Sequence, residues 1–331
     1  MRRAAATLVS IVIVTVAAAG VWFLAVRPAA DLRWAQTHTL AATGINEPAA
    51  LTARWYGTTA VLLQAGDEAI FIDPFFTRPE GVWPMLRNAQ IAPDEKRIAV
   101  WLARVGVTAL RGVLVSHSHF DHAMDAGVVA RQTGALLVGS QSTANIGLGA
   151  GLPAERIIVA TDTGSLAQPI TLGAFRVRFL AGAHAGATGG APTGDIVKPL
   201  VPPASYADYR QGGTYSIVVE HGADTVLFHG SAGHVDDALK DVHADVVFLG
   251  AALVSKPAEY LQQVVDAVGA KQVVLTHWDD FTRSLDQPLR PMPVVVNLAT
   301  FGEVLAVRTD LNAGVAPLGQ AIRLSANDPL P

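Results

Sequence analysis

Hydrophobic residues are spread unevenly along the chain, with one long apolar run ahead of many short ones. Residues 4–26 contain neither a charged residue nor a proline. A helix rises about 1.5 Å per residue, so this run would reach about 35 Å and cross a bilayer core of about 30 Å. Residues 31–51, which follow, show no clear periodicity, and we predict that they form a tether.

Short apolar runs in the rest of the chain predict alternating strands and helices. Residues 60–64 and 68–73 flank an Ala-Gly-Asp turn and predict a hairpin. Further strands are expected at 112–116, 135–138, 175–181, 215–220, 225–229, 246–250 and 272–276, and helices at 96–105, 123–133, 235–241 and 257–268. Hairpins open both halves and strand–helix alternation closes both. This order favours an α/β (α+β) fold in which helices cover the outer faces of sheets.

Two long segments, 75–95 and 185–213, are mostly without predicted elements, and such loops are usually functional or disordered. Their apolar side chains are expected either to give a cleft apolar walls or to pack the loops onto the domain. These side chains are Phe75, Phe76, Trp83, Met85, Val201, Pro202, Pro203, Tyr206 and Tyr209. The first alternative, together with a membrane segment, suggests a hydrophobic or lipid-like substrate.

Composition narrows the chemistry that the chain can perform. The 331 residues include no cysteine, which excludes disulfides, iron–sulfur clusters and thiolate zinc sites. Any metal must therefore be held by His, Asp or Glu. Three of the 24 basic residues lie before residue 31, which leaves 21 basic against 28 acidic residues and a charge of about -7. This charge argues against a nucleic-acid partner.

The flanks of the long apolar run predict where the chain resides. Arg2 and Arg3 precede the run and favour a cytoplasmic N-terminus. Cleaved signal peptides have apolar regions of about 7–15 residues, so the greater length favours an uncleaved anchor. Small residues at 17–19 and 28–30 leave a cleaved signal as the alternative. In either case the remainder is expected outside the cytoplasmic membrane, in the periplasm or at the cell exterior.

Four polar residues spaced as HxHxDH follow the strand predicted at 112–116. They are His117, His119, Asp121 and His122. In an extended segment His117 and His119 point to the same side, while Asp121 and His122 open the next helix. Imidazoles with a carboxylate suit Zn²⁺, and Fe²⁺ or Mn²⁺ less exclusively. A polar helix cap with incidental histidines is the other interpretation.

Two further histidines lie just beyond predicted strands. His184 follows the strand at 175–181 among small residues, and His277 comes directly after the strand at 272–276. With HxHxDH upstream, both are expected to complete a metal cluster. His38, His221 and His243 are expected at the surface.

The motifs HSHFDH and LTHWDDF, with WYGTT at 55–59 and AIFIDPFF at 69–76, resemble the metallo-β-lactamase superfamily of metal-dependent hydrolases. The likeness spans about residues 52–308 and is greatest to the branch of ascorbate-6-phosphate lactonase and N-acyl-phosphatidylethanolamine phospholipase D. It implies a four-layer αβ/βα sandwich with metals in a cleft at one edge of the sheets. The predicted organisation is therefore an anchor or signal peptide at 1–30, the tether at 31–51 and a hydrolase domain at 52–331.

The resemblance also assigns roles to individual residues. It implies that His117, His119 and His184 hold one metal, and that Asp121, His122 and His277 hold a second. Asp73 would orient ligands from behind, or would simply be a turn residue before Pro74. Independently of the resemblance, Asp279 or Asp280, just after His277, is expected to accept a hydrogen bond from an imidazole, the alternative being that both are solvated acids.

The chain departs from the family pattern at the bridging ligand. Many relatives have Gly-Asp-Thr-Gly after the strand at 225–228, and that aspartate bridges both metals. Here Ser231 stands at that position, and a neutral serine is a poor bridge between cations. Three alternatives follow: one metal or a weakly held second, substitution by His229 or His234, or use of the serine as a weak ligand or substrate contact.

The expected activity is hydrolysis of a small-molecule ester, lactone, amide or phosphodiester by a metal-bound hydroxide. Asp121 would orient the nucleophile and take up its proton. Two alternatives are a non-catalytic or single-metal binding protein that retains the fold, and a β-lactamase. The sequence does not indicate an oligomeric state.

Overall fold

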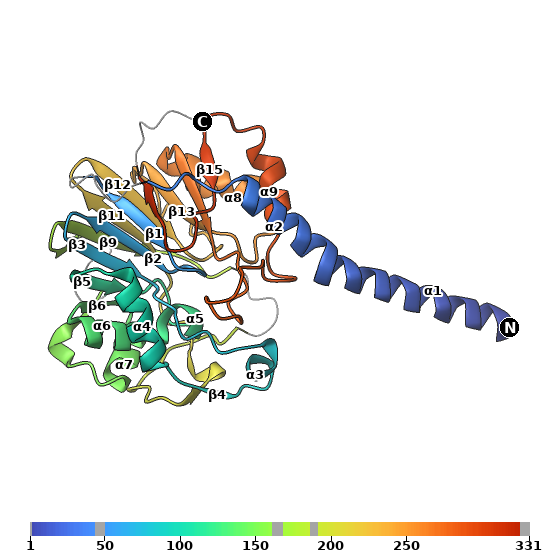
Figure 1. Ribbon diagram of the computed structural model, residues 1–331, viewed down its shortest axis with the longest axis horizontal. Helices are drawn as coiled ribbons and strands as arrows, with labels where there is room; N and C mark the ends of the chain where they lie inside the picture. Colours follow the sequence, from blue (N-terminus) through green and yellow to red (C-terminus); the bar gives the residue numbers. More distant parts are fainter. Residues whose placement is uncertain (1, 44–49, 161–167, 186–190, 325–331) are drawn as a thin grey trace.

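The computed structural model describes residues 2–43, 50–160, 168–185 and 191–324, with side chains from residue 10 onward. Parts of the predicted tether and of the loop at 185–213 therefore lie outside the described residues. Two seven-stranded sheets and a two-stranded sheet make up the described strands. Helices flank the two large sheets, and one long helix projects from the domain (Figure 1).

The first large sheet combines an antiparallel meander with a parallel extension. Strands β16, β1, β2 and β3 pair antiparallel, and β3, β5, β6 and β7 pair parallel. The bounds in sheet order are β16 Ala321–Arg323, β1 Thr52–Trp55, β2 Val61–Ala65, β3 Glu68–Ile72, β5 Ala109–Leu114, β6 Leu136–Gly139 and β7 Ile157–Val159. The predicted hairpin is thus β2–β3.

The second large sheet repeats this organisation. Strands β8, β9, β11 and β12 pair antiparallel, and β12, β13, β14 and β15 pair parallel. The bounds in sheet order are β15 Asn312–Gly314, β14 Gln272–Thr276, β13 Val246–Gly250, β12 Asp224–His229, β11 Tyr215–His221, β9 Phe175–Ala181 and β8 Ile170–Leu172. Because both sheets end in parallel strands, their carboxyl ends present loops at one edge.

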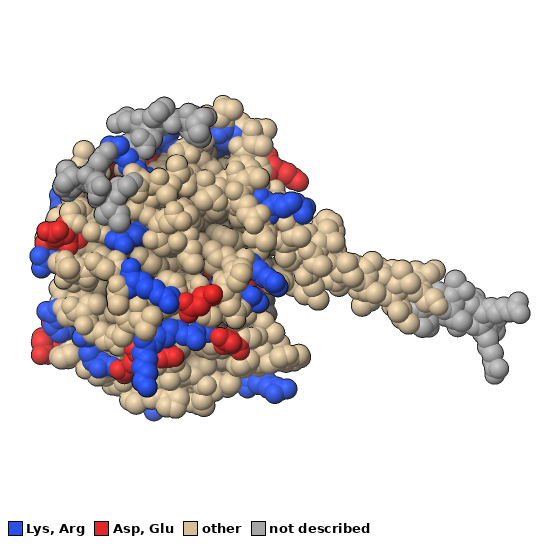
Figure 2. Space-filling view, in the orientation of Figure 1, with Lys and Arg blue, Asp and Glu red and all other residues tan. Residues whose placement is uncertain are grey.

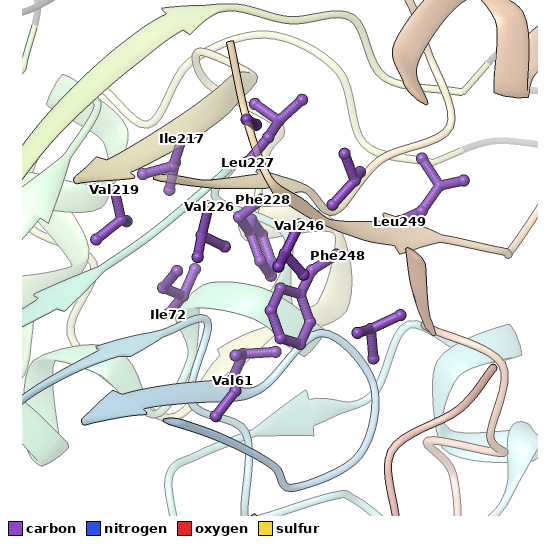
Figure 3. Close-up of a cluster of buried hydrophobic side chains, with 14 of the residues drawn as sticks. Val61, Ile72, Ile217, Val219, Val226, Leu227, Phe228, Val246, Phe248 and Leu249 are labelled. Carbon is purple, nitrogen blue, oxygen red and sulfur yellow. The ribbon is translucent and has the colours of Figure 1, made fainter. Parts of the chain in front are cut away.

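The two sheets face each other across a buried apolar core. Val61 and Ile72 of the first sheet meet Phe228 and Phe248 of the second (Figure 3). A separate cluster of buried residues lies between the first sheet and its helices. The described helices of the domain are α3 Val82–Leu86, α4 Glu95–Val105, α5 Phe120–Ala123, α6 Ala126–Thr133, α7 Gln141–Gly149, α8 Pro257–Leu261 and α9 Leu298–Leu305, with a π-helical turn at Gln262–Asp266 that continues α8 and short helical turns at Ala154–Arg156 and Tyr206–Asp208. The predicted four-layer sandwich is confirmed.

The projecting helix is long enough and apolar enough to cross a membrane. It consists of α1 Arg2–Val21, a π-helical turn at Trp22–Val26 and α2 Arg27–Thr37. The stretch from residue 10 to 37 has a mean hydropathy of 2.0 over its most apolar window and is not buried there. Between residues 10 and 26 the helix carries no charged residue, and this stretch is uniformly uncharged in Figure 2. A signal sequence meets the same test of length and composition, so the helix fits both interpretations drawn from the sequence.

Three expectations need correction. Residues 31–37 are helical, although the sequence shows no periodicity there. Residues 235–241 form turns instead of a helix, because Asp237 and Asp241 adopt left-handed backbone conformations that interrupt helical hydrogen bonding. The predicted helix at 123–133 is two helices, α5 and α6.

The aromatic residues expected at the cleft mostly pack the long loops onto the domain. Phe75, Phe76, Tyr206 and Tyr209 are buried in the cluster beneath the helices. Strands β4 Gln90–Ile91 and β10 Ala204–Ser205 pair the two loops with each other. Of the apolar residues named for the cleft, Trp83, Val201 and Pro203 are exposed. The prediction that Phe75 and Phe76 line the cleft is therefore wrong. The alternative, that the aromatic side chains pack the loops onto the domain, is confirmed for the four buried residues.

Candidate metal centre

The HxHxDH motif lies where β5 ends and α5 begins. Asp73, directly after β3, accepts hydrogen bonds from the backbone N–H of Ser116 at 2.7 Å and from its hydroxyl at 2.6 Å. These bonds fix the turn that leads into His117. The prediction that Asp121 and His122 open a helix is confirmed, because α5 starts at Phe120.

His117, His119 and His184 form the first cluster of candidate ligands. One ring nitrogen from each lies within 4.8 Å of the others. His117 and His119 come from the end of β5, whereas His184 follows β9 of the opposite sheet. The folded sheets therefore bring together histidines that are far apart in sequence.

Asp121, His122 and His277 form a second cluster with the same 4.8 Å limit. The Oδ2 atom of Asp121 lies 3.6 Å from His122 Nε2 and 3.4 Å from His277 Nε2. The rings of His117 and His122 have centroids 3.8 Å apart, so the two clusters adjoin. The structure thus brings all six predicted ligands to one place.

Outer hydrogen bonds indicate which ring nitrogens face the centre. His119 Nε2 lies 3.0 Å from the Pro192 carbonyl oxygen, and His184 Nδ1 lies 2.9 Å from that of Ala185. In a neutral imidazole, when one ring nitrogen donates its proton to a carbonyl oxygen, the second ring nitrogen is unprotonated and can use its lone pair to bind a metal. His117 Nε2 is buried and has no hydrogen-bond partner among the described residues. Unpartnered imidazole nitrogens that converge in this way fit a divalent cation.

Asp73 also determines the tautomer of His122. Its Oδ2 lies 2.8 Å from His122 Nδ1, and the Thr59 hydroxyl lies 2.9 Å from the same nitrogen. A proton on Nδ1 that is donated to the carboxylate leaves Nε2 free for the centre. Asp73 thus lies behind the predicted ligands, as the sequence resemblance implies.

Burial and mutual charge set the protonation of the centre. Burial lowers the pKa of His117 well below its usual range and that of His119 to about 4. Burial raises the pKa of Asp121, but the electrostatic interaction with the adjacent His122 imidazole and a hydrogen bond from His277 outweigh this effect and hold the pKa below its usual range. Around neutral pH His117 and His119 are therefore neutral, and Asp121 is ionised.

Ser231 lies at the cleft beside both clusters. The cleft is lined by His117, His122, His184, Ala185, Gly230, Ser231, Ala232, Ala252, Leu253 and His277. The Ser231 hydroxyl accepts a hydrogen bond from the Ala185 backbone N–H at 3.0 Å. It therefore helps to hold the segment that carries His184.

His229 does not reach the centre, which corrects its proposed use as a substitute ligand. Its Nδ1 pairs with the Ser216 hydroxyl at 2.7 Å, and its Nε2 lies 2.9 Å from the Gly233 carbonyl oxygen. Both ring nitrogens are engaged within the second half of the domain. Burial lowers its pKa to about 4, so the ring is neutral and structural.

Asp279 is buried and pairs with Arg78, a residue that the sequence analysis missed. Arg78 Nη1 lies 2.7 Å from Asp279 Oδ2, and Asp279 Oδ1 accepts from the Thr58 backbone N–H at 2.6 Å. The Thr58 carbonyl oxygen in turn accepts from the backbone N–H of His277 at 2.7 Å. Asp279 therefore supports His277 through the backbone, without the expected hydrogen bond to an imidazole. The WYGTT motif at 55–59 marked this segment as part of the family resemblance, but it did not indicate the hydrogen bonds that Thr58 makes.

The model of one family, the metallo-beta-lactamase superfamily, matches residues 53–260. The chain belongs to the metallo-β-lactamase superfamily. It is similar to a UPF0173 metal-dependent hydrolase of Pyrobaculum islandicum, with 25% identity over 228 residues, or 69% of this chain and 84% of the relative. A UPF0173 metal-dependent hydrolase of Anaeromyxobacter sp. is 30% identical over 163 residues, 46% of this chain and 53% of the relative. The chain thus spans about half the length of that second relative.

A solved structure shows the same fold. Igni18, a metallo hydrolase from Ignicoccus hospitalis, aligns with a TM-score of 0.52 and 14% identity over 83% of this chain and 98% of its own. The predictions of a metallo-β-lactamase fold and of a metal-dependent hydrolase are confirmed at this level. The resemblance to the lactonase and phospholipase branch stays a prediction.

Proposed function

We propose that this metallo-β-lactamase superfamily member hydrolyses a small ester, lactone, amide or phosphodiester with the help of Zn²⁺. His117, His119, His184, Asp121, His122 and His277 would hold one or two ions, with Fe²⁺ or Mn²⁺ as alternatives. The observation that supports this is the pair of adjoining clusters, each with ligand atoms within 4.8 Å. The buried, unpartnered Nε2 of His117 adds to it.

Each side chain of the centre has its own role in this proposal. When bound, a divalent cation supplies Lewis-acid activation of water and of the scissile group. The ionised Asp121 carboxylate accepts a hydrogen bond from the attacking water and so orients it. Asp73 holds the proton on Nδ1 of His122 and keeps the ring in place. Ser231 keeps the segment of His184 against the cleft.

A cavity of about 280 Å³ supports a small substrate. It shares Ala185, Ala232 and Leu253 with the lining of the histidine cleft. Its other lining residues are His234, Val254, Ser255, Lys256, Glu259, Tyr260 and Gln263. Polar groups predominate among them, so the proposed substrate has a polar part next to the bond that is cleaved.

We also propose that the chain is anchored in a membrane and works outside the cytoplasm. The apolar run at 4–26 would cross the bilayer, residues 31–51 would link it to the domain, and the domain would extend from residue 52 to 331. The stretch from residue 10 to residue 26, which projects from the domain and carries no charged residue, supports this proposal.

Metal content and hydrolysis are to be measured together on the full chain in detergent. Zinc-supplemented protein is expected to contain at least about one metal per chain and to hydrolyse members of a panel of esters, lactones, phosphodiesters and a β-lactam. His117→Ala should lose both metal and activity while its circular dichroism is unchanged. His243→Ala, at an exposed position outside the centre, is the matched control. An active, metal-free protein would contradict the proposal.

A further inference from the structure

The projecting helix is fixed to the domain through α2. The Asp31 carboxylate is buried and accepts a hydrogen bond from the Ala299 backbone N–H at 2.9 Å, at the start of α9. The Arg27 guanidinium donates to the Val296 carbonyl oxygen just before that helix. The Trp34 ring lies so close to Gly302 that a methyl group at this glycine would overlap it. A helix held at three such points sets the direction of α1 relative to the domain.

Helix α3 presents apolar side chains that the domain does not cover. Trp83 is 64% exposed, Leu86 66% and Val82 39%. The Arg87 guanidinium lies over the Trp83 ring, 5.7 Å from its centroid. Tryptophan beside arginine, with aliphatic neighbours, is typical of segments that lie at a membrane–water interface.

The direction of α1 places α3 on the side of the domain that a membrane would face. Helix α1 leaves the domain toward one side, and α3 protrudes on that same side (Figure 1). A bilayer crossed by the apolar run would therefore lie next to α3. Isolated apolar side chains are common on protein surfaces, but these three belong to one helix on the side of the domain from which the candidate membrane span projects.

We propose that Val82, Trp83 and Leu86 of α3 insert into the outer face of the lipid bilayer that α1 spans. The inference rests on the proposed membrane anchor. The clamp between α2 and α9 holds the domain against the lipid, so that the domain has one orientation instead of swinging on a tether.

The absence of cysteine makes a direct test possible, because one introduced cysteine can be labelled alone. Leu86→Cys, in the full chain, is labelled with the fluorophore NBD and incorporated into phosphatidylethanolamine–phosphatidylglycerol vesicles that contain a nitroxide-labelled lipid. Val82→Cys repeats the measurement on the same helix. Val100→Cys is the control, because Val100 is 51% exposed and its helix, α4, lies farther from that side than α3 does (Figure 1). Leu24→Cys, in the π-helical turn, reports on the anchor itself.

We expect lipid quenching at positions 24, 82 and 86 that exceeds that at position 100 by at least about threefold. Strong quenching at position 24 with values at 82 and 86 no greater than at 100 would overturn the docking of α3 and leave the anchor intact. Absence of quenching at position 24 would overturn both the anchor and the docking. Neither result would affect the assignment of the hydrolytic centre.

Discussion

Arg78 and Asp279 form an ion pair in which both side chains are buried, with Arg78 Nη1 2.7 Å from Asp279 Oδ2. The two residues come from opposite halves of the chain. Arg78 also donates to the Thr58 hydroxyl at 3.0 Å, and Asp279 accepts from the Thr58 N–H. Since Thr58 binds the backbone of His277, this network connects the first sheet to a proposed ligand from the second.

Arg78→Leu should lower the free energy of unfolding by about 3–5 kcal/mol, because it leaves a carboxylate buried without its partner. Urea unfolding followed by circular dichroism measures the change. Arg131→Leu is the matched control, because Arg131 pairs with Glu95 at the same 2.7 Å but at the surface. The control should lose less than about 1 kcal/mol. Equal losses in the two variants would contradict a structural role for the buried pair.

The sequence predicted strands well where apolar residues run without interruption or alternate with polar ones. The strands expected at 175–181, 246–250 and 272–276 have the same bounds in the structure. Strands β13 and β14 are buried along their whole length, so the apolar run itself reflects the environment, whereas β9 alternates buried apolar residues with more exposed arginines. The motif around His117 was equally readable, because its ligands lie within six residues of one another.

Contacts between segments that are far apart in the chain could not be predicted from the sequence pattern. Nothing in the periodicity around Arg78 indicates that it faces Asp279, because the pairing depends on how two sheets pack. His229 is the last residue of one strand and His277 directly follows another, yet only the fold directs His229 toward Ser216. A histidine after a strand is therefore a candidate ligand, and its partners decide its role.

Asp73→Asn should weaken zinc binding by about 10–100-fold while the fold is retained. The amide can still accept the hydrogen bond from the Ser116 N–H, but a neutral acceptor holds the His122 ring less firmly. Competition with a chromophoric chelator measures the affinity. Asp94→Asn, at the N-terminus of α4, is the control and should bind zinc like the wild type. Unchanged affinity in Asp73→Asn would show that the carboxylate only shapes the turn.

Ser231→Asp should increase the number of tightly bound metal ions. Among the six proposed ligands Asp121 is the only acid, so two divalent cations would be poorly balanced in charge. We therefore expect the wild type to hold the second ion weakly. A carboxylate at the cleft should tighten its binding at least about tenfold, as measured by elemental analysis after dialysis at a series of zinc concentrations.

Ser231→Ala separates charge from structure in this experiment. It removes the hydroxyl that accepts from the Ala185 N–H but adds no charge, so it should not tighten the second ion. If Ser231→Asp and Ser231→Ala bind the same amount of zinc, the missing carboxylate does not limit the metal content.

Asp125 provides a pH-dependent contribution to stability away from the proposed ligands. Its carboxylate accepts hydrogen bonds from the N–H groups of Phe76 and Thr77 at 2.7 Å and from the Thr77 hydroxyl at 2.6 Å. Burial raises its pKa to about 6, and these hydrogen bonds only partly oppose the rise. The folded state therefore disfavours the ionised form more than the unfolded state does.

Because the folded pKa of Asp125 exceeds the unfolded value of about 3.9, this residue should lower the free energy of unfolding as pH rises from about 4 to about 6, and no further above that. The total loss is about 3 kcal/mol. Asp125→Asn cannot ionise, and its amide oxygen can turn toward the two backbone N–H groups. The difference in stability between variant and wild type should therefore shift by about 3 kcal/mol in favour of the variant between pH 4 and pH 7. Urea unfolding at several pH values measures this difference, in which all other titrating groups cancel. Parallel curves for the two proteins would mean that Asp125 is ionised in the folded state throughout this range.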